Sequence, residues 1–301
     1  MQPNQPKSAK LYLSSPLFQR ARHHFGTIVA AVTALRSVLA DVQYRMKDLA
    51  GQYRVAVGRC KLALYQKKTR DGQPRALYWG RTFKLETPAG VRHVVRHLAG
   101  RLTARRIYTI SLRDPEKAFF RLYDRRRKPL NAEHARVAKA LGRIGQMLAL
   151  TRIASGRAPL TSPAHESDPL LDRARRLAWA CAAVEHDMAQ LARRHDPALD
   201  VSPIFPYATT TKHGYVAMGW GLPEQYVRDF RVRRGRRHVA TRLDIGLLRT
   251  LRVPRSVWPA LRAIDRDMRR LRLEHARYAK VLGRVRVLRR AAEPRRSKEC
   301  A

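Results

Sequence analysis

Acidic residues are scarce in this sequence of 301 residues: 23 Asp and Glu face 63 Lys and Arg, so the formal net charge is +40. A surface this positive repels itself unless a polyanion covers it, which makes nucleic acid the first partner to expect and an anionic membrane the second. Hydrophobic residues still make up 45% of the sequence, enough for buried cores, so a disordered basic tail is excluded. The excess of Arg over Lys suits bidentate phosphate recognition, although a GC-rich genome would produce the same bias.

Cysteine is rare as well, and long apolar runs are missing. Cys60, Cys181 and Cys300 lie far apart and form no CxxC pair, which argues against a zinc site or a disulfide framework and for a reducing compartment. The N-terminal segment has no apolar leader region, and no run of 18 apolar residues occurs. We therefore expect a soluble cytoplasmic protein, bound to the nucleoid if it binds DNA, with no membrane partner.

The common catalytic motifs are missing as well. The sequence has no Walker loop, no GxGxxG, no HExxH, no GxSxG, and no group of carboxylates in its basic stretches that could hold Mg²⁺. We expect no enzyme, no cofactor and no metal site. A metal-dependent nuclease or recombinase is the enzymatic alternative.

An internal repeat organises the chain. The segment LNAEHARVAKALGRI at 130–144 returns 141 residues later as LRLEHARYAKVLGRV at 271–285, with ten of fifteen positions identical. At offsets of 141 and 142 residues the alignment extends upstream, and it pairs Trp79-Gly80 with Trp220-Gly221 and His97 with His238. We interpret the chain as a tandem duplication with copies at 1–153 and 154–301.

Apolar residues alternate at spacings of 3 and 4 in two long stretches of each copy, the pattern of a helix with one apolar seam. The four expected helices cover about 24–56, 115–152, 169–196 and 256–290. Each copy should pair its two helices as an antiparallel, coiled-coil-like stalk, with a kink or short break at Pro129. The clearest seam on the last helix consists of Val257, Leu261, Ile264, Met268, Leu271, His275, Tyr278, Leu282 and Val285.

Between the helices of each copy lies a basic head, at about 58–113 and 204–255. Alternating residues and turn signals predict a β-hairpin in each head, and a short basic helix is expected after it. The fold class is therefore mainly α with small β-hairpins (α+β). The expected strands are Cys60–Tyr65, Arg75–Trp79, Tyr207–Thr211 and Tyr215–Trp220, with a further strand at Arg106–Leu112, and the expected short helices lie near Ala89–Arg105 and Arg233–Arg249.

Positive charge concentrates in these heads. Residues 54–113 contain fifteen Lys or Arg and two acids, and residues 206–255 contain eleven and three. A basic hairpin beside a basic helix could follow a phosphate backbone, although a solvated basic face explains any single arginine equally well. The candidate nucleic-acid-binding residues are Lys67, Lys68, Arg70, Arg92, Arg96, Arg101, Arg105, Arg106, Lys212, Arg233, Arg234, Arg236, Arg237 and Arg242.

Two pairs of repeated residues carry alternative interpretations. Trp79 and Trp220 could stack on an exposed base, but a Trp at the end of a hairpin strand more often packs in the core. His134 and His275 fall on helix seams beside Glu133 and Glu274. Neighbouring helical residues point in different directions, so a buried histidine bonded across the stalk is favoured over a Glu–His acid–base unit.

These observations predict a non-enzymatic nucleic-acid-binding protein, with double-stranded DNA favoured over RNA. Two basic heads in one chain would form an intramolecular pseudo-dimer for two related half-sites, as in an accessory protein of a mobile element. One alternative is an RNA-binding component of a ribonucleoprotein. The other is a coiled-coil scaffold that binds a protein partner through its stalks.

Overall fold

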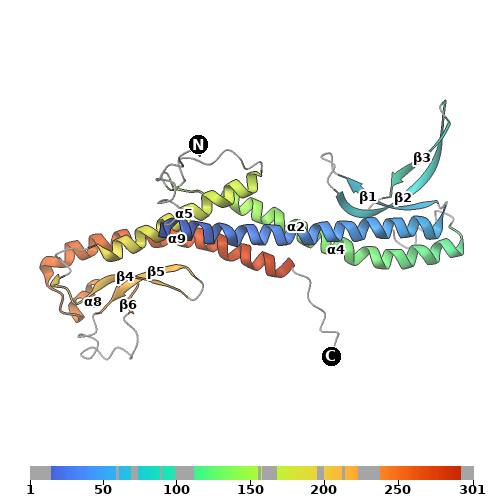
Figure 1. The fold of residues 1–301 in the computed structure, drawn as a ribbon. Helices are drawn as coiled ribbons and strands as arrows, with labels where there is room; N and C mark the ends of the chain where they lie inside the picture. The colour runs from blue at the N-terminus through green and yellow to red at the C-terminus, as the bar shows by residue number, and fades with distance from the viewer. Residues whose placement is uncertain are drawn as a thin grey trace, which may run out of the picture. The chain divides into compact units, whose positions relative to one another are not determined.

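The protein is mainly helical and carries small antiparallel sheets, so the α+β expectation is confirmed (Figure 1). The computed structural model describes residues 15–58, 61–68, 74–88, 90–98, 112–154, 157, 168–194, 200–211, 214–222 and 238–292. The four expected long helices are present. They are α2 (Pro16–Val57), α4 (Asp114–Leu150), α5 (Pro169–Arg193) and α9 (Trp258–Ala292).

Helix α4 continues through Pro129 from Asp114 to Leu150, so of the expected kink or short break the break does not occur. Proline removes one backbone hydrogen bond and crowds the preceding turn, which is costly in a helix that stands alone. Here Tyr123 before the proline and Val137 after it are both buried. Packing on either side of Pro129 therefore stabilises the helix enough to compensate for the lost backbone hydrogen bond.

Packing divides the chain into two compact units. One, here called the α5–α9 unit, comprises the chain up to Ala31 together with Gly145–Val287. The other, the α2–α4 unit, comprises Val32–Ile144 and the chain from Leu288 onward. The boundaries lie inside α2, α4 and α9, whereas the sequence repeat predicts a boundary near residue 153. The first turns of α2 thus belong to the unit that contains most of the second copy.

The α2–α4 unit contains a three-stranded sheet in the order β1 (Leu62–Lys68), β2 (Pro74–Thr87) and β3 (Gly90–His97). Both neighbouring pairs are antiparallel. The beginning of β2 packs with β1 and the two helices in one apolar core, whose buried members are Val42, Met46, Leu49, Ala50, Tyr53, Leu62, Leu64, Leu77, Trp79, Leu112, Phe120 and Tyr123.

Strand β3 corrects the prediction of a short helix near Ala89–Arg105. Gly90 has a φ of 111°, which few residues other than glycine adopt, and it pairs with Thr87 at the end of the hairpin. Valines at 91, 94 and 95 then favour extended backbone over helix. The rest of that expected helix, and the strand expected at Arg106–Leu112 apart from Leu112, lie outside the described residues.

The α5–α9 unit contains a second sheet, in the order β4 (Phe205–Thr210), β5 (Val216–Gly221) and β6 (His238–Ala240). The helix expected near Arg233–Arg249 is corrected as well, because 238–240 form a strand and helix α8 spans only Ile245–Thr250. A 3₁₀ turn, η1 (Arg255–Val257), leads into α9. All nine predicted seam residues between Val257 and Val285 are buried.

The registers of the two sheets correspond. Leu64 pairs with Trp79 in one sheet, and Pro206 pairs with Trp220 in the other. Gly80 pairs with His97, and Gly221 pairs with His238. These partners are the residues that the 141- and 142-residue offsets of the sequence repeat place at equivalent positions.

By length and composition alone, α2 could cross a membrane: it contains an 18-residue stretch apolar enough for this, 28% of which is buried. Ile28, Val32, Leu35 and Val42 on this helix are buried. Core helices of water-soluble proteins pass the same test, so the length and composition of α2 do not establish a membrane span.

Candidate nucleic-acid interface

Beyond the core of the α2–α4 unit, β2 and β3 continue as a two-stranded ribbon. Strand β1 pairs with β2 only as far as Arg81, whereas β2 and β3 stay paired to the turn between Thr87 and Gly90. In Figure 1 this hairpin extends away from α2. Four large apolar side chains of the ribbon are exposed: Leu85, Val91, Val94 and Val95. A free ribbon with exposed apolar residues is a typical binding element, because it presents both faces to a partner.

Basic side chains line the ribbon. Arg81, Lys84 and Arg96 are exposed, and Glu86 is the only acid in β2 or β3. Arg81 lies opposite Arg96 in the register, and their guanidinium carbons lie 5.0 and 5.3 Å from the centroid of the Phe83 ring. The aromatic ring holds both arginines on one face of the ribbon by cation–π attraction. Each guanidinium still has donors available for phosphate oxygens or base edges.

A cleft of about 700 Å³ opens at the base of the ribbon. Its walls come from the end of α2, from β1 and from the ribbon. They combine three basic side chains, Arg54, Lys61 and Lys84, with three aromatic ones, Tyr53, Tyr65 and Phe83. Such a lining suits a polyanion with flat bases better than an apolar ligand.

The structure places some of the predicted binding residues on these sheets. Lys67 on β1, Arg96 on β3 and Arg242 after β6 are exposed. The backbones of Lys68 and Arg92 lie in β1 and β3. The remaining candidates lie outside the described residues: Arg70, Arg101, Arg105, Arg106, Lys212, Arg233, Arg234, Arg236 and Arg237.

Arg54, Lys61, Arg81 and Lys84 were not singled out from the sequence. They belong to the basic stretch 54–113, so its charge count includes them. The short helix expected after the hairpin placed the candidate binding residues of the first copy mainly at 92–106 instead. Interpreting 90–97 as a strand, in which alternate side chains share a face, would have placed Arg96 beside the basic residues of β2.

The stacking role proposed for Trp79 and Trp220 is corrected, because both rings are buried at 3% and 0% exposure. Neither ring has a free face for a base, and the core-packing alternative describes both. Trp79 Nε1 donates a hydrogen bond to Asp124 Oδ1, and Trp220 Nε1 donates to Asp265 Oδ1, each at 3.0 Å. In each unit the indole N–H thus donates to a buried aspartate, and the two aspartates occupy equivalent positions in the repeat.

Asp124 receives further donors from its own helix. Arg127 Nη2 lies 2.7 Å from Oδ1, and Lys128 Nζ lies 2.8 Å from Oδ2. Burial alone would raise the pKa of Asp124, but the hydrogen bonds from Lys128, Trp79 and Arg127 outweigh it and lower the pKa below the usual 3.8. The aspartate therefore stays ionised and ties Trp79 to α4.

We expect this aspartate to make the protein acid-sensitive. Its pKa is lower in the folded than in the unfolded chain, so its contribution to stability is complete above the usual 3.8 and disappears as the pH falls through the folded value. Urea unfolding of the wild type and of Asp124→Asn at several pH values tests this. The stability difference between them should be constant above pH ~5 and shrink below pH ~4. A difference that does not change with pH would contradict the assignment.

The predicted bond across the seam is present at His275. In the α5–α9 unit, His275 on α9 lies with Nε2 3.1 Å from Oε1 of Glu185 on α5, and both residues are buried. His24 Nε2 and Arg20 Nε lie 3.0 and 3.1 Å from the other carboxylate oxygen of Glu185. Burial would raise the pKa of Glu185, but bonds from His24 and His275 outweigh it and lower the pKa to about 2. Sequence reasoning did not single out His24 or Glu185.

This carboxylate–imidazole group lies inside the unit. The side chains of Glu185 and His24 are each 1% exposed, so an external substrate cannot reach them. The group does not support an acid–base enzyme, which needs its catalytic residues within reach of the substrate. His134, the counterpart of His275 in the repeat, is half-buried on α4.

The fold and the surface together define a mainly helical protein with two small sheets among its described residues, one of which extends a basic ribbon. The chain matches no family model, and no curated protein or solved structure shows significant similarity to it.

Proposed function

We propose that the protein binds nucleic acid without catalysing a reaction, and that duplex DNA is its main ligand. The observation that carries the proposal is the exposed β2–β3 ribbon with Arg81 and Arg96 beside Phe83. The major groove of B-form DNA admits a two-stranded ribbon, and arginines can contact both phosphates and guanine edges there. The net charge of +40 supports a polyanionic partner.

We also infer that the chain is a tandem duplication whose copies act as a pseudo-dimer. The ten identities in the repeat, the corresponding sheet registers and the two Trp–Asp hydrogen bonds support this. In each copy the two long helices would form the stalk, and the small sheet would form the head. Two heads in one chain suit a duplex with two related half-sites, and a cytoplasmic protein associated with the nucleoid would follow.

The salt dependence of binding tests the proposal. Fluorescence anisotropy with a labelled DNA duplex should show the logarithm of the association constant falling linearly with the logarithm of salt concentration, by about 0.9 for each phosphate that the protein neutralises. Three such phosphates would weaken binding roughly 40-fold between 50 and 200 mM salt. A flat salt dependence together with a tight protein partner would favour the scaffold alternative.

The same assay separates DNA from RNA and binding from cleavage. Double-stranded RNA has a major groove too deep and narrow for a ribbon, so it should bind more weakly than DNA of equal length. A preference for single-stranded RNA would favour the ribonucleoprotein alternative. With only Glu86 as an acid on β2 and β3, the ribbon has no carboxylate pair for two metal ions, so duplex incubated with Mg²⁺ or Mn²⁺ should stay intact.

A further inference from the structure

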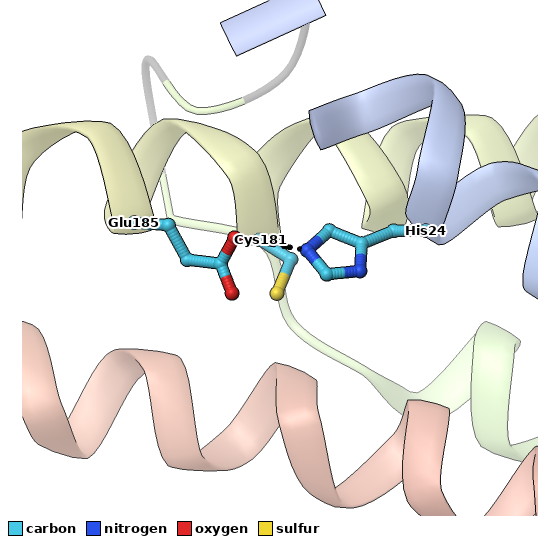
Figure 2. A group of neighbouring side chains, drawn as sticks. All are labelled: His24, Cys181 and Glu185. Atoms are coloured by element: carbon cyan, nitrogen blue, oxygen red, sulfur yellow. Dashed lines mark hydrogen bonds and ion pairs between the residues drawn. The ribbon is translucent and has the colours of Figure 1, made fainter. Parts of the chain in front are cut away.

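Three side chains with metal-binding atoms meet inside the α5–α9 unit. His24 comes from α2, while Cys181 and Glu185 come from α5, and their potential ligand atoms all lie within 4.8 Å of one another. Figure 2 shows Cys181 and Glu185 reaching from one helix toward the imidazole of His24. All three are buried, at 1% exposure for His24, 0% for Cys181 and 2% for Glu185.

The set has the composition of a transition-metal site. Imidazole, thiolate and carboxylate are the three ligand types that Zn²⁺ uses in proteins. Cys181 and Glu185 are four residues apart on α5, so they share one face of the helix, and His24 lies opposite from another element. Two ligands at i and i+4 with a third from a different helix would connect α2 to α5.

Glu185 is held in place as metal-binding carboxylates are. Its Oε1 accepts hydrogen bonds from the backbone N–H of Val216 at 3.3 Å and from His275 at 3.1 Å. Its Oε2 faces His24 and Arg20. Arg20 has 30% of its side chain exposed, so it can move out toward solvent when a cation takes its place. Outer partners of this kind orient ligands and tune their affinity.

The apolar seam alone does not account for these residue types. Nε2 of His24 lies 3.0 Å from Oε2 of Glu185, so this nitrogen is the one placed to bind an ion. At an offset of 142 the repeat places Leu39 at the position of Cys181 and Gln43 at that of Glu185. The first copy thus has an apolar and a neutral residue where the second has two potential ligands, a step that rests on the inferred duplication.

We propose that the α5–α9 unit binds one transition-metal ion of the Zn²⁺ class through His24, Cys181 and Glu185. His275 holds Glu185 from its other oxygen and is a positioning residue. A metal ion binds the thiolate form of cysteine, so binding releases the thiol proton of Cys181 to solvent as the sulfur–metal bond forms. Thiolate and carboxylate then balance the two charges of the ion. Three protein ligands leave one position of a tetrahedral ion for water.

The test uses the full chain, expressed without a histidine tag and stripped with a chelator. Titration with Co²⁺ should saturate at one equivalent per chain and give a thiolate-to-metal absorption band in the near ultraviolet, and Zn²⁺ should displace the Co²⁺. Cys181→Ser should remove the band, and Cys181→Ser and His24→Gln should each weaken binding roughly 100-fold or more. His275→Gln should weaken it about 10- to 100-fold and keep the band.

Matched controls come from the same chain. Cys60→Ser tests whether another thiol supplies the band, and His134→Gln removes the counterpart of His275 in the first copy; both should leave stoichiometry and spectrum unchanged. Circular dichroism shows whether each variant is folded. If folded wild-type protein gives no band with Co²⁺, or if Cys181→Ser keeps it, the proposal is wrong. DNA binding is measured separately, so this failure would leave the proposed function untouched.

Discussion

Replacing Arg81, Lys84 and Arg96 together by Glu is expected to weaken duplex binding by about two orders of magnitude or more. The three side chains are exposed on the β2–β3 ribbon, and two of them lie beside Phe83. Each reversal leaves one phosphate without its basic partner and adds repulsion from the same position. The slope of binding against salt should also fall by about 0.9 for every phosphate that is no longer neutralised. Anisotropy titrations at several salt concentrations measure both effects.

The matched control changes the same charge on a different element of the same unit. Arg125, Arg136 and Lys139 are exposed on α4, and their triple replacement by Glu lowers the net charge by the same six units. We expect this control to weaken binding less than tenfold, as a long-range effect of charge. Equal losses of affinity in the two triple variants would mean that bulk charge, and not the ribbon, determines affinity. Circular dichroism should show unchanged helicity in both.

Where a periodic pattern of apolar residues extended over many positions, the sequence predicted the secondary structure well. The seam from Val257 to Val285 extends over nine positions, so no other secondary structure could bury all of them, and α9 matches it. The bond across the seam at His275 was also predictable, because a histidine among apolar seam residues needs a partner when it is buried. Its partner, Glu185, was not predictable, since a single seam does not say which residue of another helix faces it.

Shorter patterns were less reliable. Residues 90–97 have basic and apolar residues that suit either a helix face or a strand, and only the turn at Gly90 and the valines favour β3. The buried group of His24, Cys181 and Glu185 combines residues 157 positions apart that no motif connects. Closely spaced cysteines are a metal signature that a sequence can show, whereas side chains brought together by packing leave no such pattern.

The α5–α9 unit should depend strongly on Asp265. Its Oδ1 accepts hydrogen bonds from Trp220 Nε1 at 3.0 Å and from the backbone N–H of Leu243 at 3.3 Å. The carboxylate is also ion-paired with Arg269, and the residue is 1% exposed. Asp265 thus joins the sheet, the chain before α8 and the turns of α9 at one buried point. Removing it leaves several donors without an acceptor inside the unit.

We expect Asp265→Ala to lower the free energy of unfolding by about 3–5 kcal/mol, the cost of breaking a buried charged network by removing one partner. Asp267→Ala is the control, because Asp267 lies two residues away on α9, is 46% exposed and reaches Arg270 only at 3.7 Å. Exposed pairs of this kind contribute at most about 1 kcal/mol. Urea unfolding followed by far-ultraviolet circular dichroism compares the two variants. Similar small decreases in both would show that Trp220 and Leu243 do not depend on this carboxylate, and the anchoring role of the repeated Trp–Asp bond would have to be abandoned.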